Sequence, residues 1–151
     1  MAELKERLRA DLNAAMRARD QVRMRTLRMA LTSITNEEVA GASARDLTDD
    51  EVLKVLTREA RKRREAAEAF SAAGRSDQAA AERAEGEVLA GYLPAQLSDD
   101  ELAALVDAAI AETGASGPGA LGQVMKTVTP RIAGRADGAR VAAEVRRRLS
   151  A

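Results

Sequence analysis

The sequence predicts an all-α, multihelical protein with a long-helix N-terminal lobe and a compact three-helix C-terminal lobe. Apolar residues recur about every 3.6 positions along the chain, and no sustained alternation of period two is present. Aromatic residues are nearly absent, since Phe70 and Tyr92 are the only two among 151 residues. A core of Leu, Val, Ile, Met and Ala suits close helix packing, whereas sheets draw more on aromatic and β-branched residues.

Two helices are predicted before Gly41. One face of the first helix is apolar and carries Leu4, Leu8, Leu12, Ala15 and Met16. Asp20 is the expected N-cap of the second helix, because its carboxylate can accept hydrogen bonds from the free amides of a first turn. The apolar stripe of that helix consists of Met24, Leu27, Leu31 and Ile34. Gly41 is expected to end it in a left-handed conformation.

The next pair of helices is predicted between residues 48 and 94. Thr48-Asp49-Asp50-Glu51 has the pattern of a capping box, in which the hydroxyl accepts from the third amide of the helix. The third helix is expected to end at Gly74 and to bury Val52, Val55, Leu56, Ala60, Ala67 and Phe70. Asp77 is the expected cap of a fourth, Ala-rich helix. This helix should end near Pro94, because proline biases the preceding residue towards extended conformations.

Three further helices are predicted after Leu97. Ser98-Asp99-Asp100-Glu101 is a second capping box, and Gly114 is expected to end the helix that it opens. Pro118 suits the first turn of the next helix, in which Pro130 should cause a kink or an end. Asp137 is the expected cap of the last helix. The apolar stripes of these last two helices are Leu121, Val124, Met125, Val128 and Ile132, and then Val141, Val145 and Leu149.

The segment Tyr92–Leu97 is the predicted boundary between the two lobes. Proline stops the preceding helix there, and a new capping box follows within a few residues. We therefore expect an N-terminal helical lobe over residues 1–93 and a C-terminal three-helix lobe over residues 98–151.

Composition excludes several classes of function. The absence of cysteine rules out disulfides and thiolate metal sites, and the absence of histidine removes the commonest general base and metal ligand. Basic and acidic residues number 24 each, so strong non-specific binding to nucleic acid is not expected from net charge. The N-terminus is charged and does not have the pattern of a signal peptide. No apolar run approaches the roughly 20 residues that span a bilayer. We expect a cytoplasmic protein of bacterial type.

Two local patterns resemble ligand sites but have simpler explanations. Residues 117–122 match G-x-G-x-x-G, yet a dinucleotide site needs a preceding strand, and a helix-initiating loop is the favoured interpretation. The acidic clusters 49–51 and 99–101 could hold a divalent metal through carboxylate oxygens. Both clusters fall in a first helical turn, where negative charge complements the helix dipole, so capping is the preferred explanation. The sequence predicts no catalytic residue, no cofactor site and no metal site.

Basic residues gather in two places. The densest run consists of Arg58, Arg61, Lys62, Arg63 and Arg64. Interleaved glutamates favour ion pairs on a solvated helix, and a surface for an anionic partner is the alternative. The second set could converge if the C-terminal helices pack together, and it would then suit phosphate contacts. The predicted RNA-binding residues of this set are Lys126, Arg131, Arg135, Arg140, Arg146 and Arg147, with Arg148 beside them.

Several motifs resemble the GatB/YqeY family, most closely its free-standing YqeY-like members. The resemblance covers nearly the whole chain and rests chiefly on Tyr92-Leu93-Pro94-Ala95-Gln96-Leu97, Gly122-Gln123-Val124-Met125 and Gly134-Arg135-Ala136-Asp137-Gly138. In that family the same helical unit forms the tail of the GatB subunit of the tRNA-dependent amidotransferase, and it is appended to some glutaminyl-tRNA synthetases. It acts there as a tRNA-binding appendage, while other domains carry out the chemistry.

The resemblance implies a non-catalytic, tRNA-binding accessory protein, with tRNA and a synthetase or amidotransferase subunit as partners. Two alternatives remain open at this point. One is a protein-interaction module that docks on such enzymes through the Ala-rich stretch 66–90, and the other is a glutamine-dependent carbon–nitrogen ligase. Arg135 is the first candidate for a phosphate contact, against a structural ion pair with a neighbouring acid. Gly122 is expected to permit close helix packing.

Overall fold

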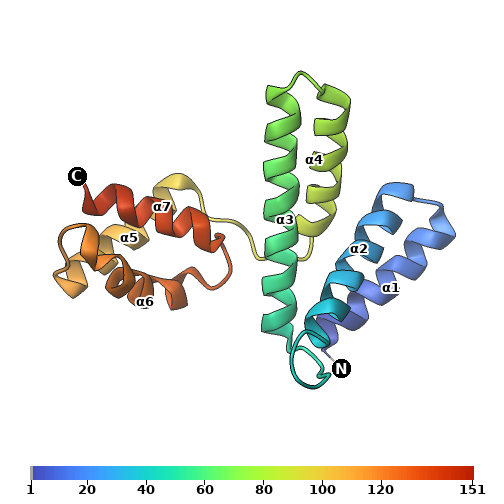
Figure 1. Cartoon of the computed structure of the whole chain (residues 1–151), viewed down its shortest axis with the longest axis horizontal. Coiled ribbons are helices and arrows are strands. Elements are labelled where there is room, and N and C mark those ends of the chain that lie inside the picture. The colour runs from blue at the N-terminus through green and yellow to red at the C-terminus, as the bar shows by residue number, and fades with distance from the viewer. Residues whose placement is uncertain (1) are drawn as a thin grey trace. The chain divides into compact units, whose positions relative to one another are not determined.

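The computed structural model describes residues 2–151, and all regular secondary structure within them is helical. The predicted all-α fold class is confirmed. The chain divides into two compact units, Met1–Leu93 and Pro94–Ala151, each with its own hydrophobic core (Figure 1).

The first unit consists of two helical hairpins. Helices α1 (Glu3–Ala18) and α2 (Gln21–Glu38) form one, and the longer α3 (Asp49–Ala72) and α4 (Ser76–Ala90) form the other (Figure 1). All four helices contribute to one core, because each presents an apolar stripe to the others. The buried residues of that core are Leu8, Leu27, Ala30, Ile34, Leu47, Val52, Val55, Leu56, Leu89 and Tyr92.

The α1–α2 hairpin departs from the sequence prediction at both of its ends. Met16 is 46% exposed, because Ala15 already takes the inward position and successive helical residues point roughly 100° apart. Gly41 does not end α2, which stops at Glu38 with Val39 as its C-cap. The Glu38 carbonyl accepts a hydrogen bond from the Arg45 amide across the following loop, so the chain has already left the helix before the glycine. Asp20 caps α2 as predicted.

The α3–α4 hairpin begins as predicted and turns more tightly than predicted. The Thr48 hydroxyl accepts from the Glu51 amide, and Gly74 has a φ of 74° just after α3 ends. The Arg75 amide donates back to the Phe70 carbonyl, so α4 starts at once and Asp77 falls inside its first turn rather than at its cap. Phe70 lies near this exposed tip and is therefore only half-buried instead of being a core residue.

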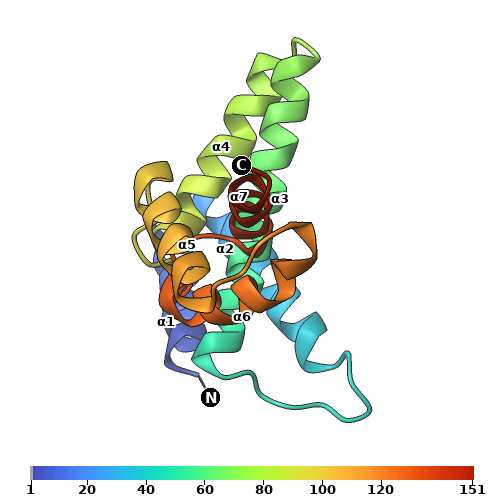
Figure 2. The ribbon, with the colours of Figure 1, turned by 90° about the vertical axis from the view of Figure 1, so that its left-hand side faces the viewer.

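The second unit is a three-helix bundle with one short 3₁₀ turn. Its helices are α5 (Asp99–Thr113), α6 (Leu121–Ile132) and α7 (Gly138–Leu149), and the turn η1 (Pro118–Ala120) precedes α6. Figure 2 looks nearly along α7, next to which α5 and α6 lie. The buried residues of its core are Leu97, Leu102, Val106, Ala109, Val124, Val128, Ile132, Ala136, Val141, Val145 and Leu149.

Most of the predicted helix ends in the second unit are confirmed. Ser98 and Asp137 accept hydrogen bonds from amides of the first turns of α5 and α7, and Gly114 ends α5 with a φ of 65°. Pro130 lies within the last turn of α6, which continues only to Ile132. The predicted role of Gly122 is wrong, because among the described residues no atom outside its own stretch of helix lies within 4 Å of where its Cβ would be. The residue sits on an open helix surface and does not serve close packing.

Candidate functional site

The six predicted RNA-binding residues all lie in the second unit, on α6, on α7 or in the turn between them. Because α6 packs directly against α7, these residues come from neighbouring elements of one bundle. Their side chains nevertheless differ in what they contact. Two hold the fold together, two form ion pairs at the surface, and two have no partner in the part of the chain that the structure describes.

Arg135 caps the carbonyl end of α6. Its Nε donates to the Ile132 carbonyl at 3.2 Å and its Nη2 to the Arg131 carbonyl at 3.0 Å. These carbonyls have no partner within the helix, and a cation there also complements the dipole. The structural ion pair considered from the sequence is not formed within residues 2–151, since the guanidinium meets main-chain oxygens instead of a carboxylate.

Arg140 joins the start of α7 to the segment before α5. Its Nη1 donates to the Leu97 carbonyl at 2.8 Å, and its Nη2 lies 2.9 Å from Asp99 Oδ1. The Leu97 amide in turn donates to the Arg135 carbonyl at 2.8 Å. The Tyr-Leu-Pro and Gly-Arg-Ala-Asp-Gly motifs are therefore two sides of one junction. Pro94 belongs to it as well, with its Cγ 3.7 Å from where a Cβ on Gly134 would lie.

Arg131 and Arg147 form ion pairs at the surface. Arg131 meets Glu112 of α5 at 2.5 Å, and Arg147 meets Glu144 one turn earlier on α7 at 2.7 Å. Arg148 also reaches Glu144, at 3.0 Å. The hydrogen bond from Arg147 is the largest influence on Glu144 and, together with Arg148, lowers the pKa of that carboxyl despite its partial burial. These arginines are already largely neutralised within the unit.

Lys126 and Arg146 differ from the other four. Both side chains are exposed, and within residues 2–151 neither forms an ion pair or a hydrogen bond with the protein. They lie on α6 and α7, which pack against each other. The unit as a whole carries no excess charge. Its seven basic residues, Lys126, Arg131, Arg135, Arg140, Arg146, Arg147 and Arg148, face seven acids, Asp99, Asp100, Glu101, Asp107, Glu112, Asp137 and Glu144. Lys126 and Arg146 are thus the cations most available to an external anion.

The basic run on α3 forms ion pairs, as the favoured interpretation predicted. Arg58 pairs with Glu37, Arg61 with Glu65 and Lys62 with Glu59. Arg63 is not part of the solvated face that the charge pattern of this run predicts, since it is only 6% exposed. One signal could have revealed this. Arg63 falls seven residues after Leu56 and four before Ala67, on the apolar stripe of the helix.

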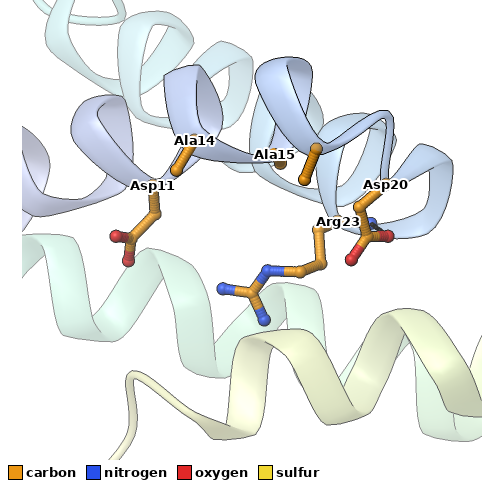
Figure 3. Close-up of a pocket in the computed structure, with 6 residues that line it drawn as sticks. Asp11, Ala14, Ala15, Asp20 and Arg23 are labelled. Atoms are coloured by element: carbon orange, nitrogen blue, oxygen red, sulfur yellow. Dashed lines mark hydrogen bonds between the residues drawn. The ribbon is translucent and has the colours of Figure 1, made fainter.

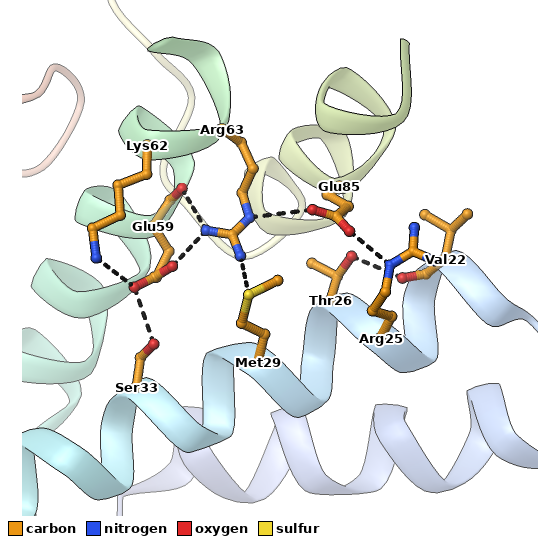
Figure 4. Close-up of polar contacts among 9 residues, drawn as sticks. All are labelled: Val22, Arg25, Thr26, Met29, Ser33, Glu59, Lys62, Arg63 and Glu85. Atoms are coloured by element: carbon orange, nitrogen blue, oxygen red, sulfur yellow. Dashed lines mark hydrogen bonds and ion pairs between the residues drawn. The ribbon is translucent and has the colours of Figure 1, made fainter. Parts of the chain in front are cut away.

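Arg63 lies at the centre of a polar network inside the first unit (Figure 4). Its Nη1 meets the Glu59 carboxylate at 2.5 Å, and its Nε lies 3.5 Å from Glu85 of α4. Ser33 of α2 donates to Glu59 at 3.0 Å, and Arg25 of α2 holds Glu85 at 2.8 Å. The network therefore connects three helices. Burial opposes ionisation of Glu59, but the hydrogen bonds from Arg63 and Ser33 outweigh it and lower the pKa of that carboxyl.

Tyr92, the first residue of the Tyr-Leu-Pro motif, anchors the end of the first unit. It is 7% exposed, and its hydroxyl donates to Asp11 Oδ2 of α1 at 2.5 Å. The Arg7 guanidinium carbon lies 4.7 Å from the centre of its ring, which is a cation–π contact. Burial, followed by the hydrogen bond and the charge of Asp11, raises the pKa of Tyr92 to about 12. The phenol is therefore a donor at every physiological pH.

The glycine-rich segment 117–122 and the two acidic clusters lie at helix starts, as the sequence predicts. Residues 117–122 form η1 and the start of α6, with a helix and loop before them instead of a strand. The acids at 49–51 and 99–101 occupy first turns, and Asp49 additionally accepts from the Leu4 amide at 3.0 Å. In the described part of the chain no three acidic residues are grouped so that they could hold a metal ion.

Comparisons with known proteins show the family to which the chain belongs. No protein of curated function was found to match the chain. None of the helices formed by residues 2–151 has an apolar stretch long enough to cross a membrane. The sequence model of one family, described as Yqey-like protein, matches residues 5–149. Since that match spans almost the whole chain, including the junction between the two motifs, the protein belongs to the YqeY-like family.

Proposed function

We propose that the protein is a tRNA-binding accessory factor that uses the α6–α7 side of its second unit. The observation that carries this proposal is the pair Lys126 and Arg146. Both are exposed cations that have no partner among residues 2–151, on two helices that pack against each other. Lysine and arginine are the side chains that most often contact nucleic-acid phosphates. Membership of the YqeY-like family supports the same assignment through the tRNA-binding role implied by the family resemblance.

The mode of binding follows from charge and composition. The second unit contains no aromatic residue on which a base could stack, because Phe70 and Tyr92 both precede it. It also carries no net charge, so general electrostatic attraction to RNA is weak. Recognition would depend on a few phosphates held in the right geometry by a folded RNA. Arg135 and Arg140 position the α6–α7 turn in this account, and their loss would disturb the fold as well as binding.

A comparison of the affinities for two RNAs tests the proposed mode of binding. The protein should bind folded tRNA more tightly than an unstructured RNA of the same length and charge, as measured by fluorescence anisotropy at low salt. Equal affinity for the two RNAs would contradict recognition of a folded shape. Absence of binding to tRNA at low salt would contradict the proposal altogether.

A second candidate is a docking module for a synthetase or amidotransferase. It is favoured by α4, where Ala80, Ala81 and Ala90 are exposed and would allow close approach of a partner helix. Part of the Ala-rich stretch is already occupied, since Ala67 and Ala79 are buried within the unit. A pull-down performed after ribonuclease treatment separates the two candidates. A retained synthetase or amidotransferase supports docking, and loss of all partners with the RNA supports tRNA binding alone.

We also propose that the chain does not release ammonia from glutamine by itself. Hydrolysis of glutamine would need an activated nucleophile, and the sequence offers neither cysteine nor histidine. Ser98 is engaged as a helix cap, with its hydroxyl bonded to the amide and carboxylate of Glu101. Incubation with glutamine, ATP and misacylated tRNA should therefore yield no glutamate. Its release by the purified chain, together with amidation of the misacylated tRNA, would support the ligase alternative.

A further inference from the structure

A small pocket lies in the first unit where α1 ends and α2 begins. Its volume is about 190 Å³, and the residues that line it are Asp11, Ala14, Ala15, Ala18, Asp20 and Arg23 (Figure 3). One wall is apolar, because the three alanines present only methyl groups. The other lining groups are two carboxylates and one guanidinium. The pocket is too small for a nucleotide and is large enough for a small metabolite.

The guanidinium of Arg23 is available for a ligand. The backbone amide of Arg23 donates to Asp20 Oδ1 at 3.1 Å and so caps α2, but the side chain takes no part in this contact. Among residues 2–151 the side chain makes no hydrogen bond or ion pair, although Arg7, Arg25, Arg45 and Arg58 in the same unit all have carboxylate partners. In the view of Figure 3 the guanidinium lies between the carboxylates of Asp11 and Asp20.

Each of the two carboxylates has one oxygen that no donor among residues 2–151 contacts. Asp11 receives the Tyr92 hydroxyl on Oδ2 at 2.5 Å, and the Nε of Arg7 lies 3.9 Å from the same oxygen. Asp20 uses Oδ1 for the helix cap. Within the described residues no donor meets Asp11 Oδ1 or Asp20 Oδ2. Asp11 is also held in place, because its partner Tyr92 is buried and stays protonated.

We propose that this pocket binds a small zwitterion of the α-amino-acid class. The ligand carboxylate would pair with the Arg23 guanidinium, whose planar fork matches two carboxylate oxygens. Its ammonium group would meet the free Oδ1 of Asp11, on one side of the guanidinium in Figure 3, and a short aliphatic side chain would lie against the alanine wall. A dianion such as phosphate would face two carboxylates, and a simple amine would leave the guanidinium unpaired. Only a ligand with both charges can pair with the guanidinium and a carboxylate at the same time.

An NMR titration with L-alanine tests the proposal. The amides of residues 11–23 should shift on titration, while those of the second unit should not. Propionate and ethylamine each lack one of the two charged groups. Each should bind at least about tenfold more weakly than L-alanine, because one charge-assisted contact is lost. Binding of either analogue as tightly as L-alanine, or no shift in residues 11–23 at the highest soluble concentration, would overturn the proposal.

Two variants on the same helix provide the matched comparison. Arg23→Gln removes the guanidinium that the ligand needs, and Arg28→Gln removes an exposed arginine of α2 that does not line the pocket. Arg23 makes no side-chain bond within the described residues, so its replacement should leave the helical circular dichroism unchanged. We expect Arg23→Gln to weaken binding of L-alanine about tenfold and Arg28→Gln to leave it unchanged. Equal binding by Arg23→Gln and wild type would refute the site. The titration contains no RNA, so its outcome is independent of the proposed tRNA role.

Discussion

Arg63 shows how a single residue can belong to a charged run in the sequence and to the interior in the structure. Its four basic neighbours between positions 58 and 64 include three with exposed or half-buried ion pairs, whereas Arg63 is 6% exposed between Glu59 and Glu85. Charge pattern alone predicts a solvated face for all five residues. The position of Arg63 on the apolar stripe predicts burial. The residue is buried because the two carboxylates within reach compensate for its charge.

Replacement of Arg63 by methionine should be strongly destabilising. Methionine fills a similar volume but removes the buried cation between Glu59 and Glu85, which keep only the exposed Lys62 and Arg25 as partners. Loss of one partner of a buried ion pair typically costs about 3–5 kcal/mol. Arg58→Met is the matched control, because the Arg58–Glu37 pair is exposed and should contribute less than about 1 kcal/mol. Urea unfolding followed by the fluorescence of Tyr92, the only tyrosine, reports on the first unit. Similar losses of unfolding free energy in the two variants would contradict the role given to the network.

A second buried pair makes the first unit sensitive to acid. Lys5 Nζ lies 2.7 Å from Glu38, with both residues less than a tenth exposed, and this hydrogen bond lowers the pKa of Glu38. Because the folded-state pKa is depressed, the stabilisation is present above the ordinary value of 4.5 and is lost as pH falls through the folded-state pKa.

The free energy of unfolding of the first unit should therefore decline below pH 4.5. Glu38→Gln removes the titrating group, so this variant should be less stable at neutral pH and should lose less stability on acidification. Urea midpoints measured between neutral pH and pH 3 provide the comparison. A wild-type midpoint that does not change with acid, or an equal decline in the variant, would argue against the depressed pKa.

At the scale of elements, most helix starts are predicted well from the sequence, with Asp77 as the exception, and some helix ends are not. Asp20, Thr48, Ser98 and Asp137 each cap a helix as predicted, because capping needs only a short polar side chain three residues before its donor. The end of α2 depends instead on a hydrogen bond to Arg45 across a loop. Such a contact has no signature in the local sequence, so the prediction that Gly41 ends α2 is wrong.

Two glycines of the second unit should respond oppositely to alanine. Gly134 has a φ of 77°, and alanine there should cost about 1 kcal/mol through backbone strain alone, because its Cβ would meet Pro94 only at an ordinary 3.7 Å. Gly122 lies within α6 in open space, where alanine should stabilise by about 0.5–1 kcal/mol. Thermal unfolding followed by circular dichroism measures both. Stabilisation by Gly134→Ala or destabilisation by Gly122→Ala would contradict the conformations assigned to these positions.

For the whole molecule, the all-α class follows from periodicity and composition. Which basic side chains are left to contact an external anion does not follow from them. The sequence places six candidate RNA contacts in one region. Only the structure distinguishes Lys126 and Arg146 from Arg135 and Arg140, which bond to the carbonyls of Ile132, Arg131 and Leu97. Those bonds depend on which segments meet in three dimensions. The hydrogen bond from the Leu97 amide to the Arg135 carbonyl likewise brings the Tyr-Leu-Pro and Gly-Arg-Ala-Asp-Gly motifs together in space.

The salt dependence of tRNA binding tests the proposed function most directly. Affinities of wild type and Lys126→Ala/Arg146→Ala would be measured over a series of salt concentrations, with Lys54→Ala/Arg28→Ala as a control of identical charge change in the first unit. Each lost phosphate contact should lower the slope of log affinity against log salt by about one, so the test variant should lose about two and the control none. Equal slopes and affinities for wild type and the Lys126→Ala/Arg146→Ala variant would contradict the assignment of the α6–α7 side as the tRNA-binding surface.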